Sequence, residues 1–219
     1  MKPDLALFLD ALPGLLQASL INLRIAAITC LLTLVVGAGV TVLRAQKWRL
    51  VNPPLEVLIS FLRGTPLLIQ IFLFYYGLPM LGLRLDPVAA GILAITLNTS
   101  AFLTESLRGT LLSIEEGQVE AAVAIGLPPH RIWTAILLPQ LLRRAVPIMV
   151  NEGTVIVKST ALLSMITVVE VLRTAQQAGA ASFRPIEPML GATLCFILIN
   201  LGLMAIGALL ERRFVRGRI

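Results

Sequence analysis

Long apolar runs separated by short polar segments dominate this sequence. Five runs are candidate membrane-spanning helices, at residues 19–43, 54–81, 87–107, 144–169 and 188–210. Each is long enough to cross a hydrocarbon layer of about 30 Å, which takes about 20 helical residues. The pattern therefore predicts an all-α integral membrane protein, with five transmembrane helices in one domain that covers residues 1–219.

The second run contains features that bend or shift a helix. Pro66 removes one backbone hydrogen bond and should kink the helix. The depth of Arg63 depends on where the helix begins: a start at Pro54 places Arg63 about 15 Å deeper than a start at Gly64, at about 1.5 Å per residue. Outside the runs, we expect residues 1–17 to form a short interfacial segment and residues 170–187 a polar connection.

Composition supports a membrane protein and excludes an ordinary soluble domain. The 219 residues are 57% hydrophobic and 14% charged, with a mean hydropathy of +0.90. The net charge of +6 needs no nucleic-acid partner, because basic cytoplasmic loops account for it. Cys30 and Cys195 lie inside apolar runs, where small buried residues are expected rather than a disulfide or metal pair. With a single histidine, the sequence offers no metal site.

The distribution of Lys and Arg predicts the orientation. Eleven basic residues fall in one set of loops: Arg44, Lys47, Arg49, Arg108, Arg131, Arg143, Arg144, Arg212, Arg213, Arg216 and Arg218. Four fall in the opposite set: Lys2, Arg84, Arg173 and Arg184. The richer set is cytoplasmic by the positive-inside rule, so the N-terminus is expected outside and the C-terminus inside.

Several polar side chains fall inside the predicted spans. Ionised groups cost about 2.5–3.5 kcal/mol each in a membrane on insertion scales, so they are expected to face the bundle interior. A zwitterionic solute needs a cation for its carboxylate and an acceptor for its ammonium. We therefore predict a solute site from the following residues: Glu152, Asn98, Arg63, Lys158, Ser100 and Thr99. The alternative is a structural polar network or a subunit contact.

The least apolar stretch of the middle of the chain, residues 109–139, predicts a helical hairpin. Ser113 with Glu116 three residues later has the pattern of a capping box, which indicates a helix start. Gly126 is placed to end that helix in the left-handed conformation. Pro129 suits the first turn of a second helix. A short helix, a tight turn and another helix form a rigid projection that suits docking into a partner.

The spacing within this stretch resembles a known pattern. Glu120, Ala121 and Ala122, then Gly126, and later Ile136, Leu138 and Pro139 fit EAA-x3-G-x9-I-x-L-P. This is similar to the coupling loop of permease subunits of ATP-binding-cassette (ABC) importers. The resemblance implies that Glu120, Ala121, Ala122, Gly126 and Pro139 contact an ATPase subunit from the cytoplasm.

The resemblance extends from about Leu12 to Phe214. FLRGTPLLIQIFLFYYGLP at 61–79, LLPQLLRRAVPIMVNE at 137–152 and KSTALLSMITVVEVLRTA at 158–175 look like segments of the polar amino-acid uptake branch. This branch implies a five-helix type I permease of the bacterial cytoplasmic (inner) membrane. Its implied partners are a second permease subunit, an ATPase dimer, an extracytoplasmic solute-binding protein and membrane lipid.

The predicted function is thus uptake of a polar amino acid, driven by a separate ATPase. The chain has no G-x-x-x-x-G-K-[ST] sequence, so ATP binding and hydrolysis are expected on the partner, with no cofactor here. An opine or a zwitterionic osmolyte is the alternative solute. An ion-coupled secondary carrier is a different class, but such carriers usually show internal repeats, and none is evident. A membrane enzyme is a third class, for which no catalytic constellation appears.

Overall fold

The computed structural model describes residues 5–46 and 48–214, and every regular element within these ranges is helical. The α-helices are α1 (Leu5–Ala45), α2 (Asn52–Gly64), α3 (Leu67–Phe72), α4 (Pro87–Leu112), α5 (Glu116–Ala124), α6 (Pro129–Ile132), α7 (Leu138–Ser159), α8 (Val171–Ser182) and α9 (Ile186–Phe214). Tighter or wider turns extend some of them: the π-helices η1 (Leu73–Gly77) and η3 (Trp133–Leu137), and the 3-10 helices η2 (Leu78–Leu81) and η4 (Thr160–Ile166).

Four helical segments are long and apolar enough to cross a membrane, namely residues 5–45, 87–112, 129–166 and 186–213. A fifth candidate is the pair formed by α2 and residues 67–81, which is bent by 109° at its break. The predicted all-helical membrane protein is confirmed, and the kink predicted at Pro66 is the break between α2 and α3.

Helix α1 is longer than its apolar run predicts. Residues 5–17, expected to form an interfacial segment, belong to this helix. They are helical because they have a surface to bury: Leu15 and Ala18 pack against Val171 of α8 and Cys195 of α9. The first part of α1 therefore belongs to the helical bundle.

The polar connection predicted at residues 170–187 is mostly helical, because it contains α8. Glu170 caps this helix by accepting hydrogen bonds from the backbone N–H groups of Leu172 and Arg173, both at 2.9 Å. One face of α8, including Val171 and Ala175, is fully buried. A charged residue at the start and an apolar stripe are thus enough to make a helix of a segment with low overall hydropathy.

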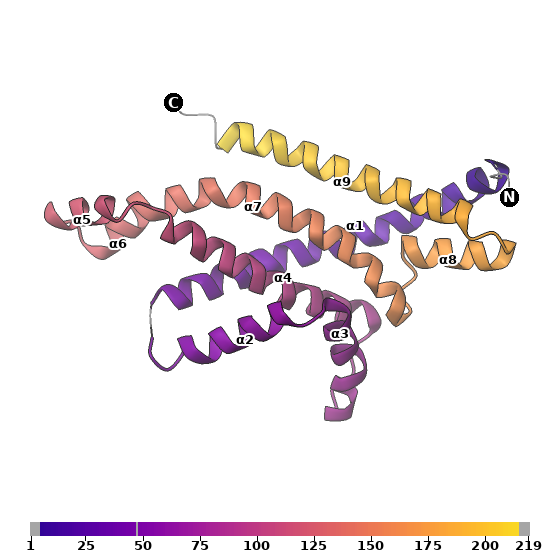
Figure 1. The fold of residues 1–219 in the computed structure, drawn as a ribbon, viewed down its shortest axis with the longest axis horizontal. Helices are drawn as coiled ribbons and strands as arrows, with labels where there is room; N and C mark the ends of the chain where they lie inside the picture. Colours follow the sequence, from indigo (N-terminus) through magenta and orange to yellow (C-terminus); the bar gives the residue numbers. More distant parts are fainter. Residues whose placement is uncertain (1–4, 47, 215–219) are drawn as a thin grey trace.

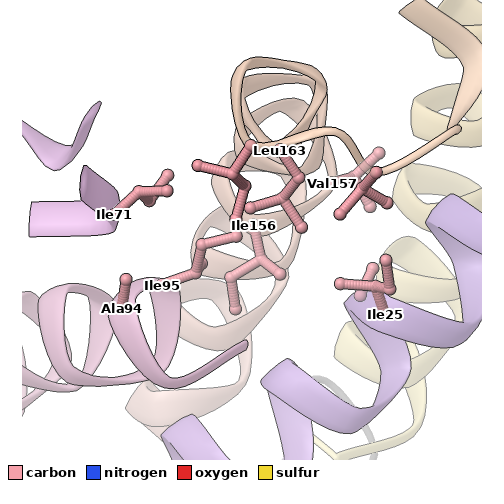
Figure 2. Packing of buried hydrophobic residues seen from close by; sticks show 10 residues of the cluster. Ile25, Ile71, Ala94, Ile95, Ile156, Val157 and Leu163 are labelled. Atoms are coloured by element: carbon pink, nitrogen blue, oxygen red, sulfur yellow. The ribbon is translucent and has the colours of Figure 1, made fainter. Parts of the chain in front are cut away.

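The bundle is assembled around α1, which packs against α4, α7, α8 and α9. Figure 1 shows α5 and α6 at one end of the long axis, with α8 and the first turns of α1 at the other. The main core lies between these ends and joins side chains from five elements, among them Ile25, Ile71, Ile95, Ile156 and Leu163 (Figure 2).

Helices α1 and α4 approach each other closely. A Cβ on Gly37 would lie 2.9 Å from the Leu103 side chain, so any other residue there would force Leu103 to shift. Hydroxyl groups follow the same contact: Thr33 shares a 2.8 Å hydrogen bond with Thr99, and Thr104 donates to the Gly37 carbonyl at 3.2 Å. Small and hydroxyl-bearing residues allow this approach in a membrane.

Candidate functional site

Helix α5 and the turn that follows it form an exposed projection at one end of the molecule (Figure 1). Gly126 has φ +76°, as its position after α5 predicts. Its N–H donates to the Val123 carbonyl at 2.9 Å, and the Leu127 N–H donates to the Ala122 carbonyl at 3.0 Å. This pair of bonds is a Schellman motif, which requires a left-handed residue at the glycine. Pro129 then occupies the first position of α6, also as predicted.

The residues of the spacing pattern lie on this projection with different exposures. Glu120, Ala121 and Gly126 are exposed, Ala122 is buried and Pro139 is half-buried at the start of α7. Two apolar side chains beside the glycine are also exposed, Val123 by 60% and Ile125 by 77%. An exposed apolar pair on a rigid turn is typical of a protein-docking surface.

The capping box predicted from Ser113 and Glu116 is absent. Because α4 continues to Leu112, Ser113 ends α4 instead of starting α5, and α5 has no side-chain cap. The Ser113 hydroxyl donates to the Thr110 carbonyl at 2.8 Å and accepts from Arg144 of α7 at 2.6 Å. The serine therefore links α4 to α7 just before the projection.

A cavity of about 620 Å³ separates the projection from the ends of α1, α2 and α4. On one side it is lined by α5 and η3, including Glu116, Glu120 and Trp133. On the other side lie Arg44 and Arg108. The projection thus reaches the bundle across a mostly apolar cavity with charged side chains on both sides, and stays joined to it through α4 and α7.

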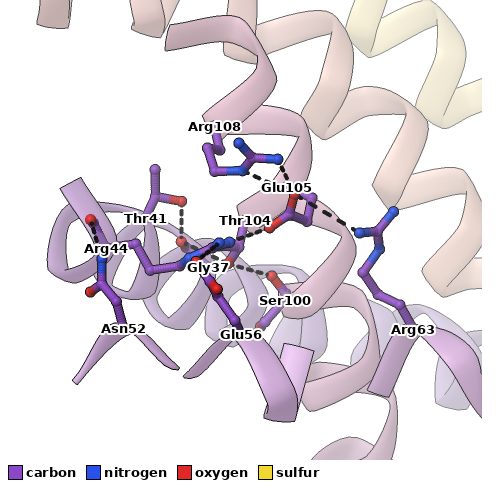
Figure 3. Close-up of polar contacts among 10 residues, drawn as sticks. All are labelled: Gly37, Thr41, Arg44, Asn52, Glu56, Arg63, Ser100, Thr104, Glu105 and Arg108. Carbon is purple, nitrogen blue, oxygen red and sulfur yellow. Dashed lines mark hydrogen bonds and ion pairs between the residues drawn. The ribbon is translucent and has the colours of Figure 1, made fainter. Parts of the chain in front are cut away.

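An ion-pair cluster on the bundle side of this cavity centres on Glu105 (Figure 3). Arg44 of α1 bonds Glu105 and also donates to Glu56 of α2 at 3.1 Å. Arg108 donates to Glu105 at 2.8 and 3.0 Å, and the Arg63 guanidinium lies 3.9 Å from the same carboxylate. The Arg44 and Glu105 side chains are only 10% and 17% exposed. The cluster therefore holds α1, α2 and α4 together at the end that carries the projection.

Sequence reasoning did not find this cluster, although a signal was present. Arg44 directly follows one apolar run and Glu105 ends another, and the predicted topology brings both ends to the same side of the membrane. Opposite charges at equivalent depths on neighbouring spans are expected to pair.

The neutral residues of the predicted solute site all take part in contacts between helices. Asn98 donates from Nδ2 to the Leu62 carbonyl of α2 at 2.9 Å. Thr99 bonds Thr33 of α1, and Ser100 donates to the Thr33 carbonyl at 3.4 Å. All three are buried. Their positions on α4 face α1 and α2, which corresponds to the structural network named as the alternative.

The charged residues of that prediction lie on two different helices. The Arg63 guanidinium stacks 5.3 Å from the Phe102 ring centre and has 42% of its side chain exposed. On α7, Glu152 is half-buried and Lys158 exposed. Over residues 5–46 and 48–214, neither Glu152 nor Lys158 forms a hydrogen bond or ion pair through its side chain. Within the described ranges the six residues therefore form no single hydrogen-bonded cluster, and their common role in a solute site stays a prediction.

A second polar contact that sequence reasoning missed joins α1, η4 and α8. Asn22 donates from Nδ2 to Thr160 at 2.8 Å and to Glu170 at 3.0 Å, and its Oδ1 accepts from the Val171 N–H at 3.1 Å. Burial raises the pKa of Glu170, and the donors from Asn22 and the backbone oppose that rise. The sequence contained a signal for this contact, because Asn22 lies in an apolar run and a buried amide needs hydrogen-bond partners.

These features define a class: a helical membrane protein with several spans and an exposed helical projection. The chain belongs to the family of binding-protein-dependent transport system inner membrane components, which residues 35–216 match. It is a multi-pass protein of the bacterial inner membrane, and the resemblance stated from the sequence is confirmed.

Several curated relatives match nearly the whole chain. It is 33% identical over 214 residues to the arginine transport system permease protein ArtQ of Bacillus subtilis, covering 97% of this chain and 98% of ArtQ. It is also 33% identical over 215 residues to the glutamine transport system permease protein GlnP of Escherichia coli, with the same coverage of 97% and 98%. The nopaline transport system permease protein NocM of Agrobacterium fabrum is 36% identical over 207 residues, covering 90% and 86%.

Solved structures share the fold. A crystal structure of an amino acid ABC transporter with histidines aligns with a TM-score of 0.91 and 24% identity, covering 97% of this chain and 100% of that one. An inward-facing MetNI methionine ABC transporter aligns with a TM-score of 0.76 and 19% identity, covering 92% and 96%.

Proposed function

We propose that this chain is the transmembrane permease subunit of an ABC importer that takes up a polar amino acid. The observation that carries the proposal is the exposed α5 projection, which ends in the left-handed Gly126 and bears the EAA-x3-G pattern. Its exposed apolar side chains suit a groove on an ATPase subunit. In this proposal ATP is bound and hydrolysed on the partner, and the permease itself needs no cofactor.

The topology that fits this role has five spans, with the bent pair of α2 and residues 67–81 crossing once. The N-terminus is outside and the C-terminus inside, so the α5 projection is cytoplasmic. Arg44, Arg108 and Arg144 at the projection end, together with Arg212 and Arg213 in the last turn of α9, support this orientation. Four basic residues of the sequence count lie outside the described residues: Lys2, Lys47, Arg216 and Arg218.

The assembly we propose contains a second permease subunit, identical or related, and an ATPase dimer on the cytoplasmic side. An extracytoplasmic binding protein delivers the solute, as the family description "binding-protein-dependent" supports. With two permease subunits, residues from both copies can border one solute path.

Within this assembly we propose Glu152 as the acceptor for the solute's ammonium group. Its carboxylate is half-buried on α7 and has no side-chain partner within the described ranges. Lys158 on the same helix and Arg63 on α2 are candidate cations for the solute's carboxylate. Asn98, Thr99 and Ser100 would contribute by fixing the helices that border the path.

An opine is the favoured alternative solute, because the nopaline permease is 36% identical to this chain. A zwitterionic osmolyte presents similar charges. An ion-coupled carrier is the different class, in which Glu152 would bind a proton or a cation and no ATPase would be needed.

One assay separates these functions. The permease complex with its ATPase is reconstituted in lipid, and ATP hydrolysis is measured with the binding protein and a panel of amino acids. Stimulation by one polar amino acid is the expected result. Stimulation only by an opine or osmolyte would change the solute, and a permease that retains no ATPase would overturn the proposal.

Glu152→Gln tests the solute contact when solute uptake is measured beside ATP hydrolysis in the same reconstituted complex. This change removes the charge and keeps the shape, so we expect lower uptake and a higher KM for the solute. The complex should still bind its ATPase, because α7 beyond Pro139 is not part of the projection. Unchanged KM and uptake would show that Glu152 does not contact the solute.

A further inference from the structure

The sharp bend between α2 and α3 is held by two side-chain amides. Proline has no backbone N–H, so Pro66 leaves the Leu62 carbonyl, four residues earlier, without its helical hydrogen bond. Gln70 Nε2 donates to this carbonyl at 2.7 Å, and Asn98 Nδ2 donates to it at 2.9 Å. Gln70 also reaches the Thr65 carbonyl at 3.1 Å and the Thr65 hydroxyl at 2.7 Å.

Water cannot easily take over this role. Gln70 is 1% exposed, Leu62 7% and Asn98 8%. A buried carbonyl that loses both donors carries the full desolvation penalty of an unmade hydrogen bond. The bend of 109° is therefore fixed by Gln70 from α3 and by Asn98 from α4.

The bend is also one residue away from the ion-pair cluster. Arg63 follows Leu62 directly, and its guanidinium lies 3.9 Å from Glu105 and over the Phe102 ring. Glu105 in turn bonds Arg44, which lines the cavity beside α5. Contiguous contacts between charged and buried groups thus connect the bend to the cavity beside the projection.

We propose that Gln70 and Asn98 are positioning residues for transport: they lock α2 and α3 into one rigid bent unit that moves with the projection end. Without these amides, α3 would change its angle independently of α2, and motion at α5 would no longer be passed from α2 to α3. The effect on transport rests on the proposed function, whereas the effect on the bend does not.

The bend is measured by the distance between two spin labels on the full chain in its complex in lipid. The labels replace Val57 of α2 and Met80 of η2, which are 70% and 87% exposed, after Cys30 and Cys195 are changed to Ala. We expect one narrow distance distribution in the parent. Gln70→Met, which keeps the side-chain length, should broaden it and move it to longer distances as the bend opens. An unchanged distribution would overturn the inference.

Asn98→Leu is a second variant, for use where Gln70→Met fails to accumulate in the membrane. We expect it to change the label distances in the same way. Asn200→Leu is the matched control. Asn200 also donates from a side-chain amide to a carbonyl, at 2.8 Å, but that carbonyl belongs to Phe196 of its own helix. Its loss should leave the label distance unchanged, and an equal broadening in the control would refute a specific role for the bend.

The transport effect is read as the maximal rate of solute-stimulated ATP hydrolysis. We expect it to fall about 10-fold in Gln70→Met, which corresponds to the loss of a buried hydrogen bond, with little change in KM for the loaded binding protein. A changed KM at unchanged rate would contradict a positioning role.

Pro66→Ala separates positioning from simple stability. Alanine restores an N–H that can donate to the Leu62 carbonyl, so the Pro66→Ala/Gln70→Met double variant should regain thermal stability. It should not regain the rate, because the restored bond favours a straighter helix. Recovery of both would refute the inference. If no solute stimulates even the parent complex, the proposed function fails, and the label distances still decide the role of the bend.

Discussion

The left-handed turn at Gly126 provides the sharpest test of the docking projection. Gly126 has φ +76°, and a Cβ built on it meets no heavy atom within 4 Å. Substitution by alanine therefore costs only backbone strain inside this chain. That strain is about 1–2 kcal/mol for a residue with a Cβ in the left-handed conformation.

This magnitude predicts a graded effect. A penalty of about 1.4 kcal/mol shifts an equilibrium tenfold, so Gly126→Ala should bind the ATPase about 10-fold more weakly where the free chain relieves the strain by leaving the turn. Asparagine tolerates the left-handed conformation better than alanine does. If Gly126 serves only the turn, Gly126→Asn should retain most of the affinity. If an ATPase surface also approaches the Cα closely, Gly126→Asn and the charged Gly126→Asp should both abolish coupling.

Gly82 offers a matched control, because it has φ +83° and open space around its Cβ. It ends η2, away from α5. Gly82→Ala should impose similar strain without changing the affinity for the ATPase. The assay is ATPase retention by the purified permease together with solute-stimulated hydrolysis. Equal losses from Gly82→Ala and Gly126→Ala, or full retention in Gly126→Asp, would refute the docking argument.

Two further predictions test the packing and the ion pairs. A Cβ on Gly207 of α9 would lie 2.4 Å from Val150 of α7, whereas one on Gly202 meets nothing within 4 Å. Gly207→Ala should therefore destabilise the protein by about 1–3 kcal/mol, as measured by thermal unfolding in detergent. Gly202→Ala should leave the stability unchanged. Equal melting temperatures for the two variants would refute the packing argument. Glu105→Gln should lower the unfolding free energy by about 1–3 kcal/mol, because it leaves buried donors poorly paired. Glu56→Gln, with Glu56 58% exposed, should change it by less than about 1 kcal/mol, and similar losses in both would contradict the central role of Glu105.

Local rules predicted the parts of this fold that depend on neighbouring residues. The turn at Gly126, the helix start at Pro129 and the break at Pro66 follow from backbone chemistry alone. The capping box at Ser113 failed because the end of α4 competes for the same residue. The capping-box pattern covers only four residues, so it cannot show whether Ser113 ends the preceding helix or begins the next one.

Contacts between distant segments could not be read from the sequence. Asn98 looked available for a solute, but its donor is engaged by a carbonyl that Pro66 frees on another helix. Glu170 looked like part of a polar connection, but it is buried and accepts a hydrogen bond from Asn22, 148 positions away. In both cases the polar group meets a partner whose position depends on how the helices pack, and one hydropathy pattern is compatible with several packings.

The placement of polar contacts divides the bundle into parts that are held with different strength. α1 and α4 share hydroxyl contacts between residues 33–37 and 99–104, and the Arg44–Glu105 pair lies beside them. Over residues 190–213 of α9, by contrast, the side-chain hydrogen bonds within the described ranges return to the same helix, from Thr193 to Met189 and from Asn200 to Phe196. A helical segment whose side-chain hydrogen bonds stay within itself is held to its neighbours by packing and can shift at lower cost, whereas breaking paired groups in a membrane leaves polar atoms without water. Helices α1, α2 and α4 should therefore move as one body during transport, and residues 190–213 of α9 should accommodate the motion.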